Sequence, residues 1–86
     1  MPVKIGNAQA SSVRDRIDAF RHTIPDDVGY TSAELQHLPG AAFGNERRIL
    51  GHMNDQHWFI TRWVGGRKVK LLVNPKTLKK YAPKAD

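Results

Sequence analysis

Cysteine is missing from this 86-residue chain, and none of its hydrophobic runs is long enough to cross a membrane. Without cysteine, the chain has no disulfide framework and no zinc site that uses thiolate ligands. A membrane-spanning helix needs about 18 or more apolar residues in succession. The opening residues "MPVKIGNAQASS" also lack the apolar segment of a secretory signal. We therefore expect a cytoplasmic protein with no membrane partner.

Patterns typical of catalytic and metal sites are also scarce. The chain has four histidines, His22, His37, His52 and His57. No two of them have the spacing that pairs zinc ligands on one face of a helix. Nucleophilic catalysis has no candidate, because no serine lies in a recognisable Ser/His/Asp context. The glycines of "GGRK" lie between two strand-like segments and so do not form a phosphate-binding loop. We expect no enzyme activity, no metal and no cofactor.

Positive charge is concentrated in the second half of the chain. The formal net charge at pH 7 is +6. Residues 1–44 carry four Lys or Arg against five Asp or Glu, a charge of −1. Residues 45–86 carry ten against three, a charge of +7. This asymmetry favours a polyanionic partner, and small basic proteins are often nucleic-acid binders. The alternative is a basic surface that serves only solubility.

Two segments in the first half have helical patterns. Apolar residues recur in "SSVRDRIDAFRHTI" at spacings of 4, 3 and 4, the stripe of an amphipathic helix that begins near Ser12 and ends before Pro25. A second helix is expected in "TSAELQHL", where Thr31 and Glu34 have the spacing of a capping box. The turn "DDVGY" between them has room for a short extended piece. Residues 1–11 show no periodicity, and we expect a flexible N-terminal arm there.

A third helical segment, residues 45–54, provides the first candidate binding surface. Its apolar residues Ile49, Leu50 and Met53 share one side of the helix. The helix start and the opposite side carry the candidate base-contacting residues Asn45, Arg47, Arg48, Gly51 and His52. Arginine can bond guanine bidentately or grip phosphate. A glycine inside a helix costs about 0.5–1 kcal/mol relative to alanine, but it lets a polyanion approach the backbone. The alternative is that the arginines only keep an exposed helix in solution.

The segment "WFITRWVGGRKVKLLV" predicts a β-hairpin over residues 58–73. Its aromatic and β-branched residues flank Gly65 and Gly66, a pair suited to the positive φ angles of a two-residue turn. Pairing outward from that turn sets Trp63 opposite Lys68. The face that we expect to pack on the core holds Trp58, Ile60, Val64, Val69, Leu71 and Val73. Arg62 falls on the same row, where it must reach solvent or find a partner.

The tip of this hairpin is the second candidate binding surface. The opposite face holds Phe59 and Leu72 near the base. Toward the tip, on that face or at the turn, the candidate contacts are Trp63, Arg67, Lys68 and Lys70. The cations can neutralise phosphates, and Trp63 can stack on a base or sugar or pack into a protein. A one-residue slip in register would instead turn Trp63 inward.

The order of these elements resembles a winged helix-turn-helix domain. The resemblance rests on "YTSAELQHL" as the helix-turn-helix entry, "NERRILGHM" as the recognition-type helix and "WFITRWVGGRKVKLLV" as the wing. It implies an α+β fold in which a three-helix core precedes a two-stranded hairpin. We place this single domain at residues 12–75, followed by a basic C-terminal tail at residues 76–86 that has room for one helical turn. The connection "PGAAFGN" is longer than the tight turn common in the class.

The resemblance also implies double-stranded DNA as the partner. Winged-helix proteins usually place the third helix in the major groove and the wing on the backbone or minor groove. The chain is therefore expected to be a small sequence-specific DNA-binding protein, a transcriptional regulator of bacterial or phage type. One short recognition helix gives limited specificity, so a homodimer on a two-fold site is a further expectation. Two alternatives stay open, because fold alone does not settle function: a protein-interaction module for an acidic partner, and an RNA-binding component.

Overall fold

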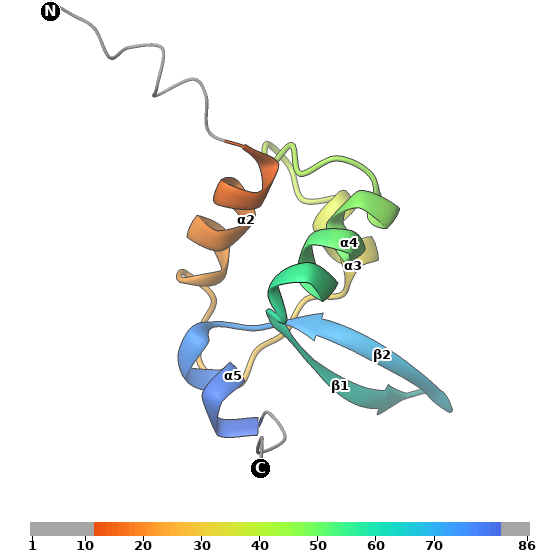
Figure 1. Ribbon diagram of the computed structural model, residues 1–86. Helices are drawn as coiled ribbons and strands as arrows, with labels where there is room; N and C mark the ends of the chain where they lie inside the picture. Colours follow the sequence, from red (N-terminus) through yellow and green to blue (C-terminus); the bar gives the residue numbers. More distant parts are fainter. Residues whose placement is uncertain (1–11, 82–86) are drawn as a thin grey trace, which may run out of the picture.

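The structure is a computed structural model, and it describes residues 12–81. Over these residues the elements are α2 (Val13–Arg21), α3 (Ser32–Gln36), α4 (Glu46–Gln56), β1 (Phe59–Val64), β2 (Arg67–Leu72) and α5 (Pro75–Tyr81). Figure 1 shows the β1–β2 hairpin extending away from the helices, with its tip clear of them. The expected N-terminal arm and the last five residues of the expected tail, 82–86, lie outside the described residues. The described chain is α+β, as the sequence predicted.

Each of the three helices before the hairpin begins with a side-chain cap, among them the capping box predicted at Thr31 and Glu34. The Oγ of Ser12 accepts a hydrogen bond from the backbone N–H of Asp15 at the start of α2 (3.1 Å). Thr31 and Glu34 form a reciprocal capping box at the start of α3. The Oδ1 of Asn45 accepts from the backbone N–H at position 48 (2.8 Å). These side chains satisfy N–H groups that a helix leaves unpaired in its first turn.

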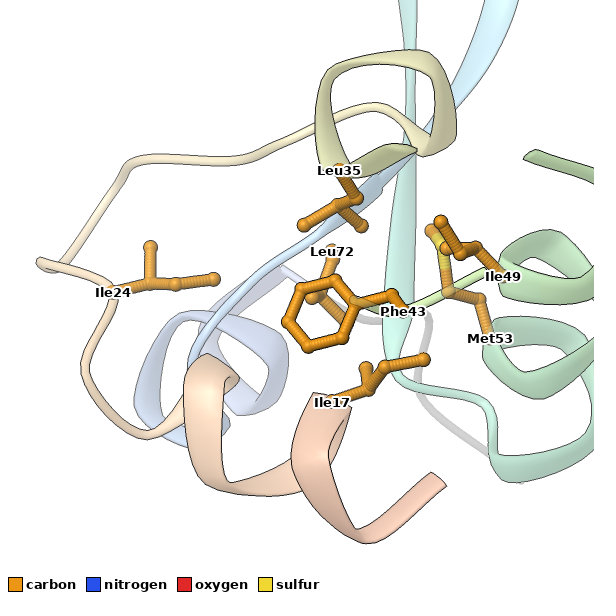
Figure 2. Close-up of a cluster of buried hydrophobic side chains, with 7 residues drawn as sticks. All are labelled: Ile17, Ile24, Leu35, Phe43, Ile49, Met53 and Leu72. Carbon is orange, nitrogen blue, oxygen red and sulfur yellow. The ribbon is translucent and has the colours of Figure 1, made fainter. Parts of the chain in front are cut away.

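The core lies where α2, α3, α4 and the base of β2 meet. Its buried cluster consists of Ile17, Ile24, Leu35, Phe43, Ile49, Met53 and Leu72 (Figure 2). In Figure 2 the Phe43 ring lies among side chains of α2, α4 and β2. Phe43 comes from the long connection between α3 and α4, and its ring also meets that of Phe20 at 5.6 Å between centroids. This connection is therefore anchored in the core by its own phenylalanine.

The hairpin pairs in the register that the sequence predicted. β1 and β2 are antiparallel, with Trp63 opposite Lys68, and both Gly65 (φ 59°) and Gly66 (φ 81°) have positive φ. The predicted extended piece before α3 also exists. The backbone N–H of Tyr30 donates to the carbonyl of Leu72 (3.0 Å), and the N–H of Leu72 donates back (2.7 Å). The segment before α3 thus joins the hairpin to the helices.

The core side of the hairpin differs from the prediction. Leu72 was placed on the face opposite the core, yet it is fully buried in the main cluster, and Phe59 packs against that cluster. The face of Ile60 and Leu71 meets α5 instead, and Ile60 is buried there. Both faces are covered at the base because α5 forms in the segment that was expected to be a basic tail. Val64, predicted to face the core, is 57% exposed because neither layer reaches the tip.

A buried asparagine ties α5 to the loop that follows α2. The Nδ2 of Asn74 donates to the carbonyl of Ile24 (2.7 Å) and to Oδ1 of Asp26 (2.8 Å). Its Oδ1 accepts from the backbone N–H of Thr77 (2.6 Å) and so caps α5. The Oγ1 of Thr77 in turn accepts from the backbone N–H of Asp27 (2.9 Å). Three hydrogen bonds thus connect segments about 50 residues apart, and a fourth caps the first turn of α5.

Replacing Asn74 should destabilise the fold. Asn74→Ala leaves the carbonyl of Ile24 and the amide of Thr77 without their partner in a buried position. We expect the free energy of unfolding to fall by about 1–3 kcal/mol, as measured by urea denaturation followed by circular dichroism. Gln56→Ala is the control, because Gln56 is exposed at the end of α4, and it should change stability by less than about 0.5 kcal/mol. Equal stability of the two variants would contradict the role of Asn74.

The side-chain amide of Asn74 should also lower the pKa of Asp26. The pKa of Asp26 lies below its ordinary value, mainly because of the hydrogen bond from Asn74 and further because of Lys76, whose Nζ lies 3.5 Å from Oδ2. A lowered folded-state pKa means that Asp26 stabilises the fold above its unfolded-state pKa, and that this contribution is lost as the pH falls through the folded-state value. Asn74→Ala should raise the pKa of Asp26 in an NMR titration, and Lys76→Met should raise it less. An unchanged pKa in Asn74→Ala would refute this assignment.

Candidate nucleic-acid interface

α4 turns its apolar side to the core and its basic side to solvent. Ile49 and Met53 are fully buried, whereas Arg47 and Arg48 are exposed. The predicted division of this helix into a buried and an exposed side is therefore confirmed. The helix continues to Gln56, past the predicted end at residue 54. The extension adds an acid, Asp55, one turn beyond Gly51 on the exposed side.

Gly51 sits where a side chain would meet nothing. A Cβ built at this position has no atom within 4 Å outside its own helix backbone, and its φ is not positive. Gly29 is the opposite case, because a Cβ there would lie 2.8 Å from the Cβ of Leu71. Neither packing nor backbone conformation within the described part of the protein requires glycine at position 51. The surface of α4 at Gly51 is therefore open to the approach of another molecule.

The exposed side of α4 has two edges, and only one of them adjoins the hairpin. Arg47 lies one turn before Leu50, which faces β2 across a groove. Arg48 lies farther around the helix and folds back toward Gly44, with its Cδ 3.3 Å from where a Cβ of that glycine would be. Half-buried His52, one turn after Arg48, shares its edge. The structure thus brings Arg47 and Gly51 toward the hairpin and leaves Arg48 and His52 on the far edge.

The hairpin tip exposes the tryptophan that the register placed outside. Trp63 is 72% exposed, and Arg67 and Lys68 beside it are exposed as well. Trp58, at the start of the same hairpin, is half-buried, and the guanidinium of Arg21 lies 4.5 Å from the centre of its ring. One tryptophan therefore contributes to the fold, whereas the other is presented to solvent.

Two other cations of the hairpin are engaged within the molecule. The Nζ of Lys70 donates to Oδ1 of Asn54 in α4 (2.6 Å) and lies 4.8 Å from the centre of the Phe59 ring. Lys70 therefore braces the hairpin against α4, a role that sequence reasoning missed when it grouped this lysine with the free contacts. The guanidinium of Arg62 lies 4.8 Å from the centre of the Tyr81 ring. Tyr81 is thus the partner of Arg62 that the sequence left open.

Four cations of α4 and β2 keep their charges free. These cations are Arg47, Arg48, Arg67 and Lys68. None of the four side chains forms an ion pair or a hydrogen bond with another residue of the range 12–81. By contrast, Arg21 of α2 and Lys80 of α5 are paired with carboxylates at 2.9 and 3.4 Å. Residues 45–72 carry six Lys or Arg against two Asp or Glu, whereas residues 12–44 carry three against five. The unneutralised charge is concentrated on the two predicted surfaces.

A groove of about 420 Å³ lies between these two surfaces. One wall is β2 from Arg67 to Lys70, and the other is the first turn of α3 together with Glu46 and Leu50 of α4. The Oγ of Ser32 donates to the Glu46 carboxylate (3.3 Å), which holds this acid at the α3 side of the groove. Asn45 lies next to it, with its side-chain oxygen already engaged as the cap of α4. A ligand that lies along the groove would touch Leu50 on one side and the hairpin on the other, with Arg47 one turn before Leu50 on α4.

Adding a methyl side chain at position 51 should stabilise the free protein. In Gly51→Ala the added methyl group meets no clash and the helix gains propensity, so the free energy of unfolding should rise by about 0.5–1 kcal/mol. Thermal unfolding followed by circular dichroism would measure the change. Gly29→Ala is the matched control, and it should destabilise because its Cβ collides with Leu71. Loss of stability in Gly51→Ala would show that this side of α4 is packed in the free protein.

Metal ligands and membrane-spanning helices are not found in the part of the chain that the structure describes. No three His, Asp or Glu side chains of residues 12–81 gather closely enough to hold a metal ion. No helix within the same range has the length and apolar character needed to cross a membrane. Comparison of the chain with protein-family models, with curated proteins and with solved structures finds no match in any of the three.

Proposed function

We propose that this protein binds double-stranded DNA with α4 and the tip of the hairpin, as a small sequence-specific regulator of transcription. The free cations carry the proposal: Arg67 and Lys68 line one groove, Arg47 lies one turn before the groove residue Leu50, and none of the three has an acidic partner among the described residues. Arg21 of α2 and Lys80 of α5 are paired with carboxylates, whereas these three cations are not, so their charge is available to a polyanion. The evenly spaced phosphates of DNA provide such a partner.

The arrangement of elements supports the winged-helix interpretation. α3 packs against α4, the hairpin follows, and Tyr30 bridges to Leu72 from the segment between α2 and α3. In this interpretation α4 enters the major groove, where Arg47 reaches base edges and Gly51 allows close approach. Arg67 and Lys68 contact the phosphate backbone from the wing. A second copy on a two-fold site would double these contacts and supply the specificity that one short helix lacks.

The first test is a titration of labelled duplex DNA at rising salt, followed by fluorescence anisotropy. If three phosphates are neutralised, the logarithm of the binding constant should fall against the logarithm of salt with a slope of about −3. Arg47→Ala should weaken binding by about 5- to 150-fold on a preferred sequence and less on others, because it removes a base contact. Lys68→Ala should weaken binding to all sequences alike and reduce the salt slope by about 1.

Lys79→Ala is the matched control for charge. Lys79 is an exposed cation of α5 with no carboxylate partner among residues 12–81, and Figure 1 shows α5 away from the hairpin tip. Its removal should leave sequence preference and affinity nearly unchanged. Equal losses in Lys79→Ala and Arg47→Ala would show that only net charge matters. Absence of duplex binding by the unaltered protein at low salt would refute the proposal, and the same titration with folded RNA or an acidic protein would then separate the two alternatives.

A further inference from the structure

Trp63 is the one feature of the candidate interface that simple phosphate binding does not use. Its indole is 72% exposed, the largest exposure among the large hydrophobic residues of the described chain. None of the ring or cation contacts described for residues 12–81 involves it. A tryptophan left in water at the end of a projecting hairpin gives no stability to the free protein. Its exposed ring faces are available to a ligand.

The residues around Trp63 define the chemistry of that ligand. Lys68 is its direct partner on β2, so both side chains leave the sheet on the same face. Arg67 follows the turn, and residues 62–68 contain no acid. The ligand must therefore combine negative charge with a flat surface that stacks on an indole. A nucleotide has both, because its phosphate is anionic and its base presents a flat face.

The shape of the tip favours a nucleic acid over a protein partner. The other exposed hydrophobic residue there is Val64, which is 57% exposed. Trp63 and Val64 are neighbours in one strand, so they point to opposite faces of the hairpin and form no continuous apolar patch. A protein interface is built around a packed cluster of anchors. Stacking on a base requires only one free ring.

An intact duplex does not offer the surface that Trp63 requires. In stacked DNA each base covers the faces of its neighbours, and the grooves expose only base edges. The face of a base becomes accessible where the base is unpaired. We propose that Trp63 stacks on an unpaired base beside the duplex segment held by α4, while Arg67 and Lys68 contact the adjoining phosphates. The preferred ligand is then DNA with a local unpaired nucleotide, an inference that rests on the DNA-binding function proposed above.

The position of Trp63 relative to α4 is fixed by the base of the hairpin. Lys70 of β2 holds this base to Asn54 of α4, and Tyr30 pairs with Leu72 along the outer edge of the same strand. Lys70 lies opposite Thr61, and Trp63 lies two residues farther along β1, about 7 Å closer to the tip. The tip thus stays close to the duplex segment that α4 would hold. An unpaired base next to that segment lies within its reach.

The experiment compares two ligands that differ by one nucleotide. A labelled duplex of about 20 base pairs and the same duplex with one bulged 2-aminopurine are titrated by anisotropy, and the 2-aminopurine fluorescence is recorded. The unaltered protein should bind the bulged duplex about 5- to 100-fold more tightly and should quench the probe, since stacking on an aromatic side chain is worth that much per base. Trp63→Ala should lose both the preference and the quenching but should still bind the intact duplex. Trp63→Phe should retain part of each.

Two variants separate this inference from the proposed function. Val64→Ala, at the same tip but on the other face, should keep the preference and the quenching. Arg47→Ala should weaken binding to both ligands by the same factor. If the unaltered protein binds both duplexes equally without quenching, the stacking role is refuted while the DNA-binding function stands. If Trp63→Ala weakens the intact duplex as much as the bulged one, Trp63 is a groove contact and the inference fails. If neither DNA is bound, or an acidic polypeptide binds instead in a Trp63-dependent way, both proposals fail.

Discussion

The arrangement of this protein depends on one residue of β2. The backbone of Leu72 exchanges two hydrogen bonds with Tyr30, its pairing partner across the hairpin is Phe59, and its side chain is fully buried in the core. Three separate parts of the described chain therefore meet at a single position: the helical core, the extended piece before α3, and the hairpin. The base of the hairpin is thus held along the outer edge of β2 and by the buried Leu72 side chain, while its tip projects from the helices (Figure 1).

Most cations of α2 and α5 are paired with carboxylates, whereas those at the start of α4 and at the hairpin tip are not. The acids are concentrated before residue 45, and four cations of α2 and α5 lie close enough to one of them to pair: Arg14, Arg21, Lys76 and Lys80. α4 and the end of the hairpin have few carboxylates within reach, because Glu46 is bonded to Ser32 and Asp55 lies beyond the last arginine of its helix. The candidate interface is thus defined by what the fold leaves unpaired, and this follows from where the two kinds of charge occur along the chain.

Features set by neighbouring residues were predictable from the sequence, whereas those set by distant segments were not. The caps at Ser12, Thr31 and Asn45 were predictable, since each depends on residues three positions apart. The hairpin register was predictable because two glycines fix the turn. The core face of the hairpin was not, because it depends on which element covers each side, and α5 was expected to be mostly tail. The links from Lys70 to Asn54 and from Arg62 to Tyr81 were missed for the same reason: each joins side chains that only the folded chain brings together.

The hydrogen bonds of the Asn74 side chain have a consequence for the order in which the protein folds. Its bond to the carbonyl of Ile24 spans 50 residues of chain, whereas the caps of α2, α3 and α4 and the packing of α3 on α4 join residues that lie closer together in sequence. Local contacts form early, and closing a long loop comes later because it carries the larger entropy cost. During synthesis, α3 and α4 can therefore pack together while the second half of the hairpin is still inside the ribosome. The face that α5 covers stays open until Asn74 has emerged, so a stalled or truncated chain would present that uncovered sheet surface to the proteases and chaperones of the cell.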